Sequence, residues 1–201
     1  MTSSPLYGLV LAGGRSTRMG TDKGLLHYHG QPQRDHVAGL LTPLCEKVFL
    51  SLNQEQAITA STNVIIDEFP DAGPLGGIWS AMRQHPQVAW LVVACDMPFL
   101  NEQTLRCLVQ HRNTTQQATV FQHPETGHIE PLVSIWEPAI YQHTEQCFKK
   151  SKQSPQQLLA TATVQIVHPS DAMFFQNVNN IEAFEEAIIT IKSNLASDMT
   201  I

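Results

Sequence analysis

The segment 9–26, "LVLAGGRSTRMGTDKGLL", joins the end of an apolar run to a loop rich in glycine and positive charge. The apolar run, "LYGLVLA" at 6–12, does not alternate between polar and apolar residues, which is typical of a strand buried on both faces of a sheet. It ends at Gly13-Gly14, where glycine permits a sharp turn and leaves room for a ligand against the main chain. Three basic residues follow within nine positions: Arg15, Arg18 and Lys23. Exposed main-chain N–H groups beside local positive charge indicate a phosphate-binding loop.

The spacing of this loop excludes two commoner phosphate-binding loops. A Walker-type loop needs a glycine directly before its lysine, whereas two residues separate Gly20 from Lys23. A dinucleotide-binding loop needs the pattern G-x-G-x-x-G, which Gly13, Gly14 and Gly20 do not supply. A plain structural loop would explain the paired glycines but not the local charge, so it stays the weaker alternative.

The composition bounds the class of protein. A chain of 201 residues with 42% hydrophobic content can bury one core, so we expect a single domain. The net charge of −6 argues against general affinity for nucleic acid or anionic membranes. No apolar run reaches the roughly 18 to 20 residues of a membrane-spanning helix, and the start "MTSSPLYG" lacks the features of a secretory signal. Four scattered cysteines without a CxxC pair indicate buried, reduced thiols, and we expect a cytoplasmic protein.

Apolar runs alternate with segments of helical spacing. Strands are predicted at 6–12, 48–52, 63–66, 90–94, 118–121, 132–136 and 164–167. Helices are predicted at 35–44, 75–84, 101–112, 137–150 and 180–195. Asn101 and Asn180 are candidate N-caps, and 149–157 is the most linker-like stretch. This alternation predicts an α/β fold with a mostly parallel sheet and helices on both of its faces.

Polar residues follow three of the predicted strands. Asn53, Asp67 and Asp96 each stand at the end of an apolar run, and ligands of open parallel sheets bind beyond the carboxyl ends of the strands. Each residue alone could be an N-cap or a turn residue. Mg²⁺ typically takes one or two carboxylates together with substrate phosphates and water, and we predict that Asp96 is such a ligand.

These residues resemble the molybdenum cofactor guanylyltransferases. "LAGGRSTRMGTDKGLL" at 11–26 matches their signature L-A-G-G-x-S-x-R-M-G-x-D-K-x-L-L, and "ACDMP" at 94–98 resembles their C-D-x-P segment, whose aspartate binds magnesium. "FFQNVNN" at 174–180 resembles their N-V-N segment. The likeness is strong over about 8–100 and looser over 128–185.

The resemblance implies a three-layer, Rossmann-like nucleotidyltransferase fold with a mostly parallel central sheet. It further implies one domain over 1–201, with a nucleotide-binding half at about 6–112 and an acceptor-binding half at about 113–195. The implied reaction transfers GMP from GTP to molybdopterin and releases pyrophosphate, with Mg²⁺ as cofactor. The acceptor phosphate is already largely dianionic at neutral pH, so no general base is expected.

The resemblance also assigns residues. The implied catalytic residues are Arg18, Lys23 and Asp96, with Asp96 as the metal ligand. The implied GTP-binding residues are Leu11, Ala12, Gly13, Gly14, Lys23, Ser51, Asn53, Asp67 and Asp96, with main-chain amides of 11–14 facing phosphate oxygens. The acceptor-binding candidates are His128, Glu130 and Asn179. The family often ends its second strand in N-x-N, and this chain has Ser51 at the first position, so whether Ser51 or Asn53 contacts the nucleotide stays open.

Three other functions remain open from the sequence. They are a cytidylyltransferase acting on the same cofactor, a nucleotide-binding module without catalysis, and a sugar-phosphate nucleotidyltransferase. Cytidylyltransferase relatives tend to have L-A-A-G in the first loop and aspartates in the N-V-N segment, so both features of this chain favour guanine. The expected partners are GTP, molybdopterin, and chaperones or other proteins of cofactor synthesis, and we expect a monomer.

Overall fold

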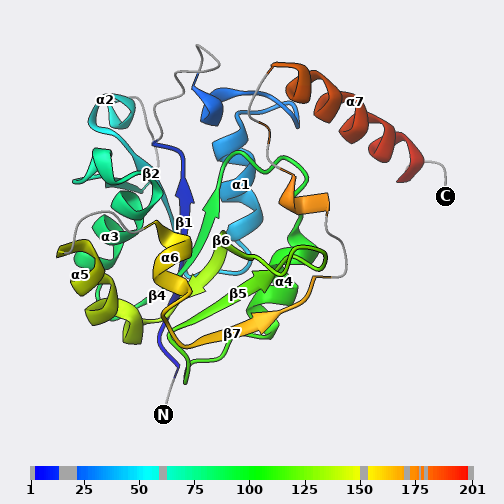
Figure 1. Cartoon of the computed structure of the whole chain (residues 1–201). Helices are drawn as coiled ribbons and strands as arrows, with labels where there is room; N and C mark the ends of the chain where they lie inside the picture. The colour runs from blue at the N-terminus through cyan, green and yellow to red at the C-terminus, as the bar shows by residue number, and fades with distance from the viewer. Residues whose placement is uncertain are drawn as a thin grey trace.

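A mixed sheet of seven strands forms the centre of the molecule (Figure 1). The computed structural model describes residues 3–13, 22–58, 63–149, 154–169, 173–176, 178 and 181–198. Its strands are β1 Leu6–Leu11, β2 Lys47–Leu52, β3 Val64–Ile66, β4 Ala89–Ala94, β5 Ala118–Gln122, β6 Ile129–Trp136 and β7 Val164–Val167. All seven predicted strands are confirmed, with boundaries that shift by up to three residues.

The strand order is β3-β2-β1-β4-β6-β5-β7. All neighbouring pairs are parallel except those of β6, which is antiparallel to both β4 and β5. The sheet is therefore mostly parallel, as predicted. Every residue of β4 is buried, because this central strand is covered on both faces. An apolar run without alternation is the sequence pattern that such a position requires.

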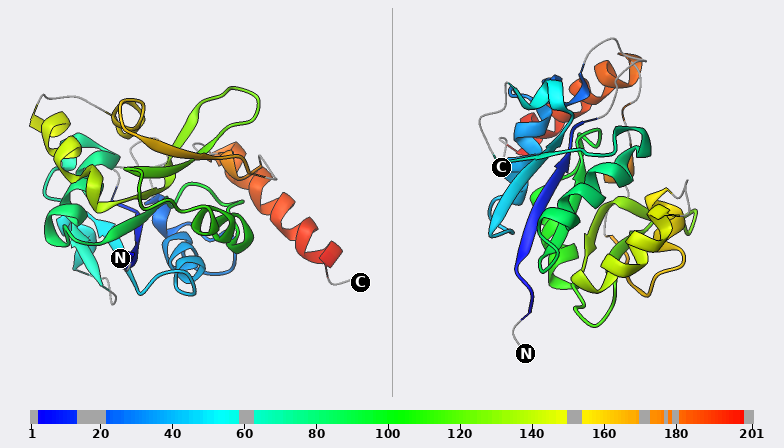
Figure 2. Two further views of the ribbon diagram at one scale, coloured as in Figure 1. Left: turned by 90° about the horizontal axis from the view of Figure 1, so that it is seen from below. Right: turned by 90° about the vertical axis from the view of Figure 1, so that its left-hand side faces the viewer.

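Helices cover both faces of the sheet and make three layers (Figure 2). The α-helices are α1 Gln33–Leu41, α2 Gln54–Ala57, α3 Pro74–Gln84, α4 Glu102–Gln110, α5 Tyr141–Lys149, α6 Pro155–Leu159 and α7 Ile181–Asp198. Four short 3-10 helices in the described ranges add to them: η1 Lys23–Leu25, η2 Pro70–Ala72, η3 Pro138–Ile140 and η4 Met173–Phe175. Buried side chains of α1 and α4 belong to one core cluster, and those of α3, α5 and α6 belong to a second.

The five predicted helices are present, and the sequence patterns missed the short helices α2 and α6. The predicted helix at 137–150 begins as η3 and continues as α5. The most linker-like stretch, 149–157, is partly helical: Lys149 ends α5, and Ser154 caps α6, which Pro155 starts. Residues 150–153 lie outside the described part of the chain. Asn101 caps α4 as predicted, accepting a hydrogen bond from the Thr104 N–H, whereas Asn180 lies outside the described residues.

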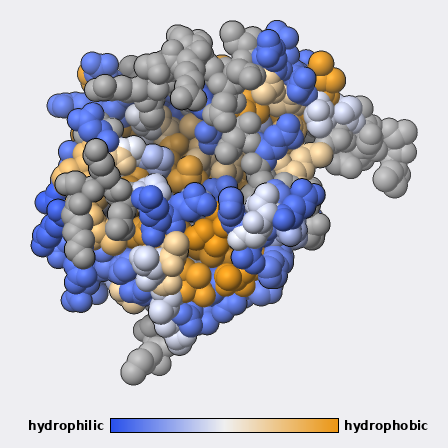
Figure 3. Space-filling view, in the orientation of Figure 1, coloured by the Kyte–Doolittle hydropathy of each residue, from blue (hydrophilic) through white to orange (hydrophobic). Residues whose placement is uncertain are grey.

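The C-terminal helix α7 extends away from the sheet (Figures 1 and 2). Its first half packs on a small separate cluster, in which Ala187 and Ile191 meet Tyr28 and Val178. Figure 3 shows an apolar area on the face of the molecule over β5 and β6.

All four cysteines are unpaired. Cys95 and Cys147 are buried, as predicted, while Cys45 and Cys107 are only half-buried. Burial raises the pKa of both Cys45 and Cys95 to about 12, so these thiols are poor nucleophiles at neutral pH. Among the described helices, none combines the length and the apolar character needed to cross a bilayer.

One buried ion pair ties the N-terminal segment to the sheet. The Arg112 guanidinium donates to both carboxylate oxygens of Glu137, at 2.6 and 2.9 Å, and also to the Ser4 main-chain oxygen at 2.9 Å. Glu137 is 2% exposed. The loss of one partner would leave a buried charge without compensation.

We therefore predict that Glu137→Ala lowers the free energy of unfolding by about 3–5 kcal/mol, because the largely buried Arg112 would keep its hydrogen bonds to Ser4 but lose its anionic partner. The matched control is Glu102→Ala, which removes the exposed ion pair with Arg106 and should cost less than about 1 kcal/mol. Urea unfolding of both variants measures the difference. Equal losses would show that Arg112 finds another partner.

Candidate active site

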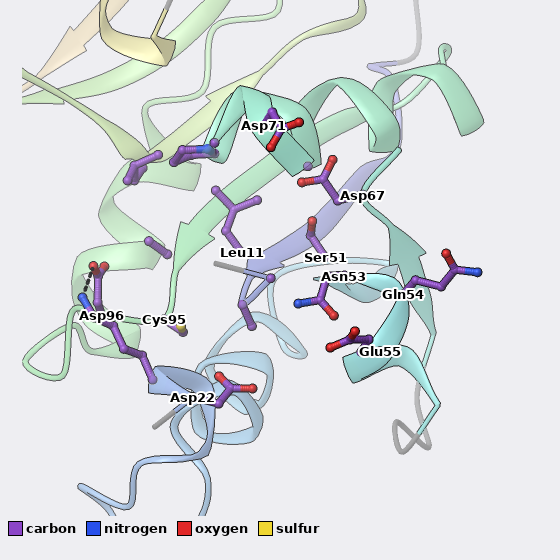
Figure 4. Close-up of a pocket in the computed structure, with 18 of the residues that line it drawn as sticks. Leu11, Asp22, Ser51, Asn53, Gln54, Glu55, Asp67, Asp71, Cys95 and Asp96 are labelled. Atoms are coloured by element: carbon purple, nitrogen blue, oxygen red, sulfur yellow. Dashed lines mark ion pairs between the residues drawn. The ribbon is translucent and has the colours of Figure 1, made fainter. Parts of the chain in front are cut away.

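A cavity of about 990 Å³ opens at the carboxyl ends of β1, β2, β3 and β4 (Figure 4). This is where ligands of open α/β sheets bind. It is lined by Leu11, Ala12, Gly13, Asp22, Lys23, Ser51, Asn53, Gln54, Glu55, Ile58, Asp67, Asp71, Gly73, Pro74, Gly77, Ala94, Cys95, Asp96 and Leu132. Every predicted GTP-binding residue that the structure describes is in this lining.

The end of β1 runs tightly against the end of β2. A Cβ atom on Gly13 would lie 3.1 Å from the Asn53 main-chain nitrogen, so a larger residue here would crowd the backbone that follows β2. The Ala12 N–H donates to the Ser51 carbonyl oxygen at 3.0 Å. The expectation that this amide faces a phosphate is therefore wrong in this structure, because the sheet already uses it. Gly14 and Arg18 lie outside the described residues.

Lys23 and Asp96 meet at one side of the cavity (Figure 4). Lys23 starts η1, and Asp96 follows β4 by two residues. The Lys23 Nζ lies 3.5 Å from Asp96 Oδ2, and the two side chains are 23% and 25% exposed. The other oxygen, Asp96 Oδ1, is buried and has no hydrogen-bond partner among the described residues.

The unpartnered Asp96 oxygen fits the predicted magnesium site. A carboxylate oxygen of this kind is a ligand that Mg²⁺ prefers, and Mg²⁺ commonly completes its shell with substrate phosphates and water. In the part of the chain that the structure describes, no group of three or more His, Cys, Asp or Glu side chains could hold a metal.

Ser51 and Asn53 both reach the cavity wall, so the structure does not choose between them. Ser51 is 2% exposed, and its hydroxyl lies where a Cβ on Gly77 would overlap it. Asn53 caps α2, with its Oδ1 accepting from the Gln56 N–H at 2.9 Å. The side-chain nitrogen of Asn53 is thereby turned toward the cavity (Figure 4).

Asp67 lies beneath the start of α3. Its Oδ1 accepts from the Phe69 N–H at 2.8 Å, and a Cβ on Gly76 would come within 2.8 Å of that oxygen. Burial raises the pKa of Asp67, partly offset by the hydrogen bond from Phe69. Gly73 turns the chain into α3 with φ +59, a conformation that favours glycine. The glycines at the start of α3 thus let this helix pack on Asp67 and Ser51.

Two acceptor-binding candidates, His128 and Glu130, are not in this lining. Glu130 accepts from the Leu132 N–H at 2.8 Å, and burial first, then the charge of Asp96, raises its pKa. His128 is exposed. Asn179 lies outside the described residues, but the neighbouring Val178 N–H donates to the Asp96 main-chain oxygen at 3.1 Å. Val178 of the N-V-N segment therefore lies next to Asp96.

Sequence reasoning missed several residues of the cavity wall. Gln54, Glu55 and Ile58 belong to α2 or follow it, and four helical residues show no periodicity. Asp22 stood inside the matched loop signature, and its cap on η1 could have been suspected from its place before Lys23-Gly24. Leu132 of the cavity wall lies in a bulge of β6. The bulge is seen in the pairing of β5 with β6, where Val120 pairs with Ser134 but the next residue, Phe121, pairs with Glu130.

Residues 8–167 of the chain match the protein family described as the MobA-like NTP transferase domain. The chain belongs to this family. A molybdenum cofactor guanylyltransferase of Pseudomonas aeruginosa is 34% identical over 161 residues, covering 77% of this chain and 80% of that protein. A probable molybdenum cofactor guanylyltransferase of Flavobacterium johnsoniae is 26% identical, covering 92% of this chain and 98% of that protein. A molybdenum cofactor biosynthesis bifunctional protein of Synechocystis is 32% identical, and the chain spans only 54% of its length.

Solved structures agree with this MobA-like fold. Molybdopterin-guanine dinucleotide biosynthesis protein A of Archaeoglobus fulgidus superposes with a TM-score of 0.77 at 19% identity, covering 93% of this chain and 99% of that one. A CMP:2-keto-3-deoxy-manno-octonic acid synthetase, solved with CTP, reaches 0.74 at 12% identity, covering 95% and 100%. At such identities the likeness shows the nucleotidyltransferase fold alone, which confirms the predicted fold class.

The glycines at the start of α3 yield a prediction. Gly76→Ala should destabilise the protein by about 1–3 kcal/mol, because its Cβ would overlap the Phe69 carbonyl oxygen and displace Asp67. Gly39→Ala on α1 is the control, since no described atom lies within 4 Å of its Cβ and it should stabilise the helix by about 0.5–1 kcal/mol. Denaturant unfolding reports both. A neutral Gly76→Ala would mean that the Phe69 loop moves freely.

Proposed function

We propose that this MobA-like chain transfers GMP from GTP to the terminal phosphate of molybdopterin and releases pyrophosphate. The observation that carries the proposal is the Lys23–Asp96 pair, whose second carboxylate oxygen is unpartnered among the described residues, at the edge of a cavity of nucleotide size. Relatives about one third identical over most of the chain carry the name molybdenum cofactor guanylyltransferase. The catalytic problem is repulsion between two anions, because the acceptor phosphate is already a nucleophile.

Lys23 and Asp96 would reduce that repulsion in different ways, Lys23 through its own positive charge and Asp96 by holding a cation. The Lys23 ammonium lies at the cavity wall and would offset charge on the α-phosphate or on the leaving pyrophosphate. Asp96 would hold Mg²⁺ through Oδ1. Bound Mg²⁺ supplies positive charge to phosphate oxygens and helps align them. The loop that contains Arg18 would add further positive charge.

Asp67 is the residue we assign to the base. Guanine presents two neighbouring donors on its pairing edge, and one carboxylate accepts both, whereas cytosine offers a single donor there. The Asp67 carboxylate lines the cavity at the side away from Asp96, the partner of Lys23 (Figure 4). This placement supports GTP over CTP. The likeness to the synthetase solved with CTP does not favour cytosine, because it extends to the fold alone.

The remaining proposals follow from the same assignment. Residues of about 6–112 would form the nucleotide half, and about 113–195 the acceptor half, where Glu130, His128 and Asn179 would contact molybdopterin. Four unpaired cysteines are consistent with the reducing cytoplasm, where we propose that the chain works as a monomer.

The test of the reaction measures pyrophosphate release with molybdopterin, Mg²⁺ and either GTP or CTP. We expect turnover with GTP and little with CTP. Lys23→Met and Asp96→Asn should each lower kcat by about a hundredfold or more, as the loss of a charge-stabilising group typically does. Lys149→Met is the control, because that lysine is 71% exposed on α5 and should leave kcat unchanged.

Any of four results would contradict the proposal. Turnover with CTP but not GTP would make the chain a cytidylyltransferase. Tight GTP binding without pyrophosphate release, or full activity of Asp96→Asn, would remove the catalytic assignment. Turnover with sugar 1-phosphates in place of molybdopterin would change the acceptor class.

The raised pKa of Asp67 predicts a pH dependence of GTP binding. The ionised carboxylate accepts from guanine, so affinity should fall as pH falls through the raised pKa, that is, at a higher pH than for an ordinary aspartate of pKa about 3.9. Binding is measured without acceptor in the native protein and in Asp67→Asn. The ratio of the two affinities cancels the titration of GTP itself, and a ratio independent of pH would exclude Asp67 as the base acceptor.

A further inference from the structure

Gln56, on the short helix α2, joins three segments of the site. Its Oε1 accepts from the Asn53 N–H at 3.2 Å. Its Nε2 donates to Asp22 Oδ2 at 2.6 Å and to the Ala12 carbonyl oxygen at 3.3 Å. These partners belong to the ends of β1 and β2 and to the start of η1. One amide group therefore connects the two strands to the turn that carries Lys23.

Asp22 links Gln56 to the turn that carries Lys23. Its Oδ1 accepts from the Gly24 N–H at 2.9 Å and so caps η1, the 3-10 turn that begins at Lys23. The Leu25 N–H donates to the Asp22 main-chain oxygen at 3.0 Å. Asp22 thus uses one carboxylate oxygen to hold the turn and the other to accept from Gln56. A shift of Asp22 would shift the start of the Lys23 side chain.

We propose that Gln56 is a positioning residue, which holds Asp22 and thereby sets Lys23 against Asp96. Gln56 is not in the lining of the cavity, although its neighbours Gln54 and Glu55 are, so it acts through Asp22 rather than on the nucleotide. The kinetic consequence rests on the proposed function, whereas the structural consequence does not.

The chemistry of an amide suits this place. A donor to a carboxylate makes a stronger hydrogen bond than a donor to a neutral group. The neutral amide satisfies Asp22 and leaves the Lys23 charge beside Asp96, where the phosphates are proposed to bind.

The chain contains a matched control for the capping part of the role. Gln157 makes the same reciprocal capping box with Ser154 at the start of α6, accepting from the Ser154 N–H at 3.1 Å. No residue of α6 lines the cavity. Gln157→Ala therefore removes a capping amide of the same kind, without the contacts that Gln56 makes to Asp22 and Ala12.

The first measurement is hydrogen exchange of the Gly24 amide in Gln56→Ala, Gln157→Ala and the native protein. We expect exchange at Gly24 to be about tenfold faster in Gln56→Ala, since Asp22 loses the donor that holds it, and to be unchanged in Gln157→Ala. This readout needs no nucleotide, so it tests the positioning role even if the proposed reaction is wrong.

The second measurement is steady-state kinetics with GTP and molybdopterin. A small displacement of a catalytic charge costs turnover more than ground-state binding, so kcat should fall about tenfold to a hundredfold in Gln56→Ala, with a smaller change in KM for GTP. Gln157→Ala should retain kcat. If the native protein shows no turnover, the proposed function fails, and the exchange measurement alone then decides the positioning role.

The isosteric variant Gln56→Glu adds a pH signature. The introduced carboxylate, when ionised, would repel Asp22, whereas a proton shared between the two carboxyl groups would restore a donor. The kcat of Gln56→Glu relative to the native protein should therefore rise as pH falls, with the nearby charges of Glu55, Lys23 and Asp96 common to both proteins. Unchanged Gly24 exchange in Gln56→Ala, equal effects of Gln157→Ala, or a pH-independent ratio would each overturn the proposal.

Discussion

The contact between Lys23 and Asp96 is the feature around which the site is built. At 3.5 Å and with about a quarter of each side chain exposed, it adds little to folding stability. It also leaves one Asp96 oxygen buried and, among the described residues, unpartnered, which costs stability unless something else binds there. A pair of this kind is better explained by a ligand than by the fold, because a phosphate and a cation would together satisfy both side chains.

The parallel sheet brings those two residues together. Leu11 of β1 pairs with Ser51 of β2 on one side and with Ala94 of β4 on the other, so the residues that follow these strands meet at one edge. β6 is antiparallel to β4, so its N-terminal end lies at the same edge of the sheet. The bulge near Glu130 then directs Leu132 into the cavity. The second half of the chain therefore contributes to the cavity wall from the first residues of β6.

Much of this arrangement could be predicted from the sequence, because the strands are apolar throughout and their polar ends stand out. Asn53, Asp67 and Asp96 were found in this way, and all three line the cavity. α2 could not be found, since a helix of four residues has no periodicity. The hydrogen bond from the Ala12 N–H to the Ser51 carbonyl oxygen could not be predicted from the sequence either. Such partners depend on the register between strands and not on the residue type.

The cap on α2 decides how Asn53 can take part in binding. An asparagine amide can be turned either way, and only its partners tell oxygen from nitrogen. Here the Gln56 N–H requires an acceptor, so the Asn53 oxygen faces the helix and the donor end faces the cavity. A donor at that point suits hydroxyl, carbonyl or phosphate oxygens, all of which a nucleoside triphosphate presents. Ser51 lines the same cavity, with its nearly buried hydroxyl against Gly77, so either side chain can still meet the nucleotide.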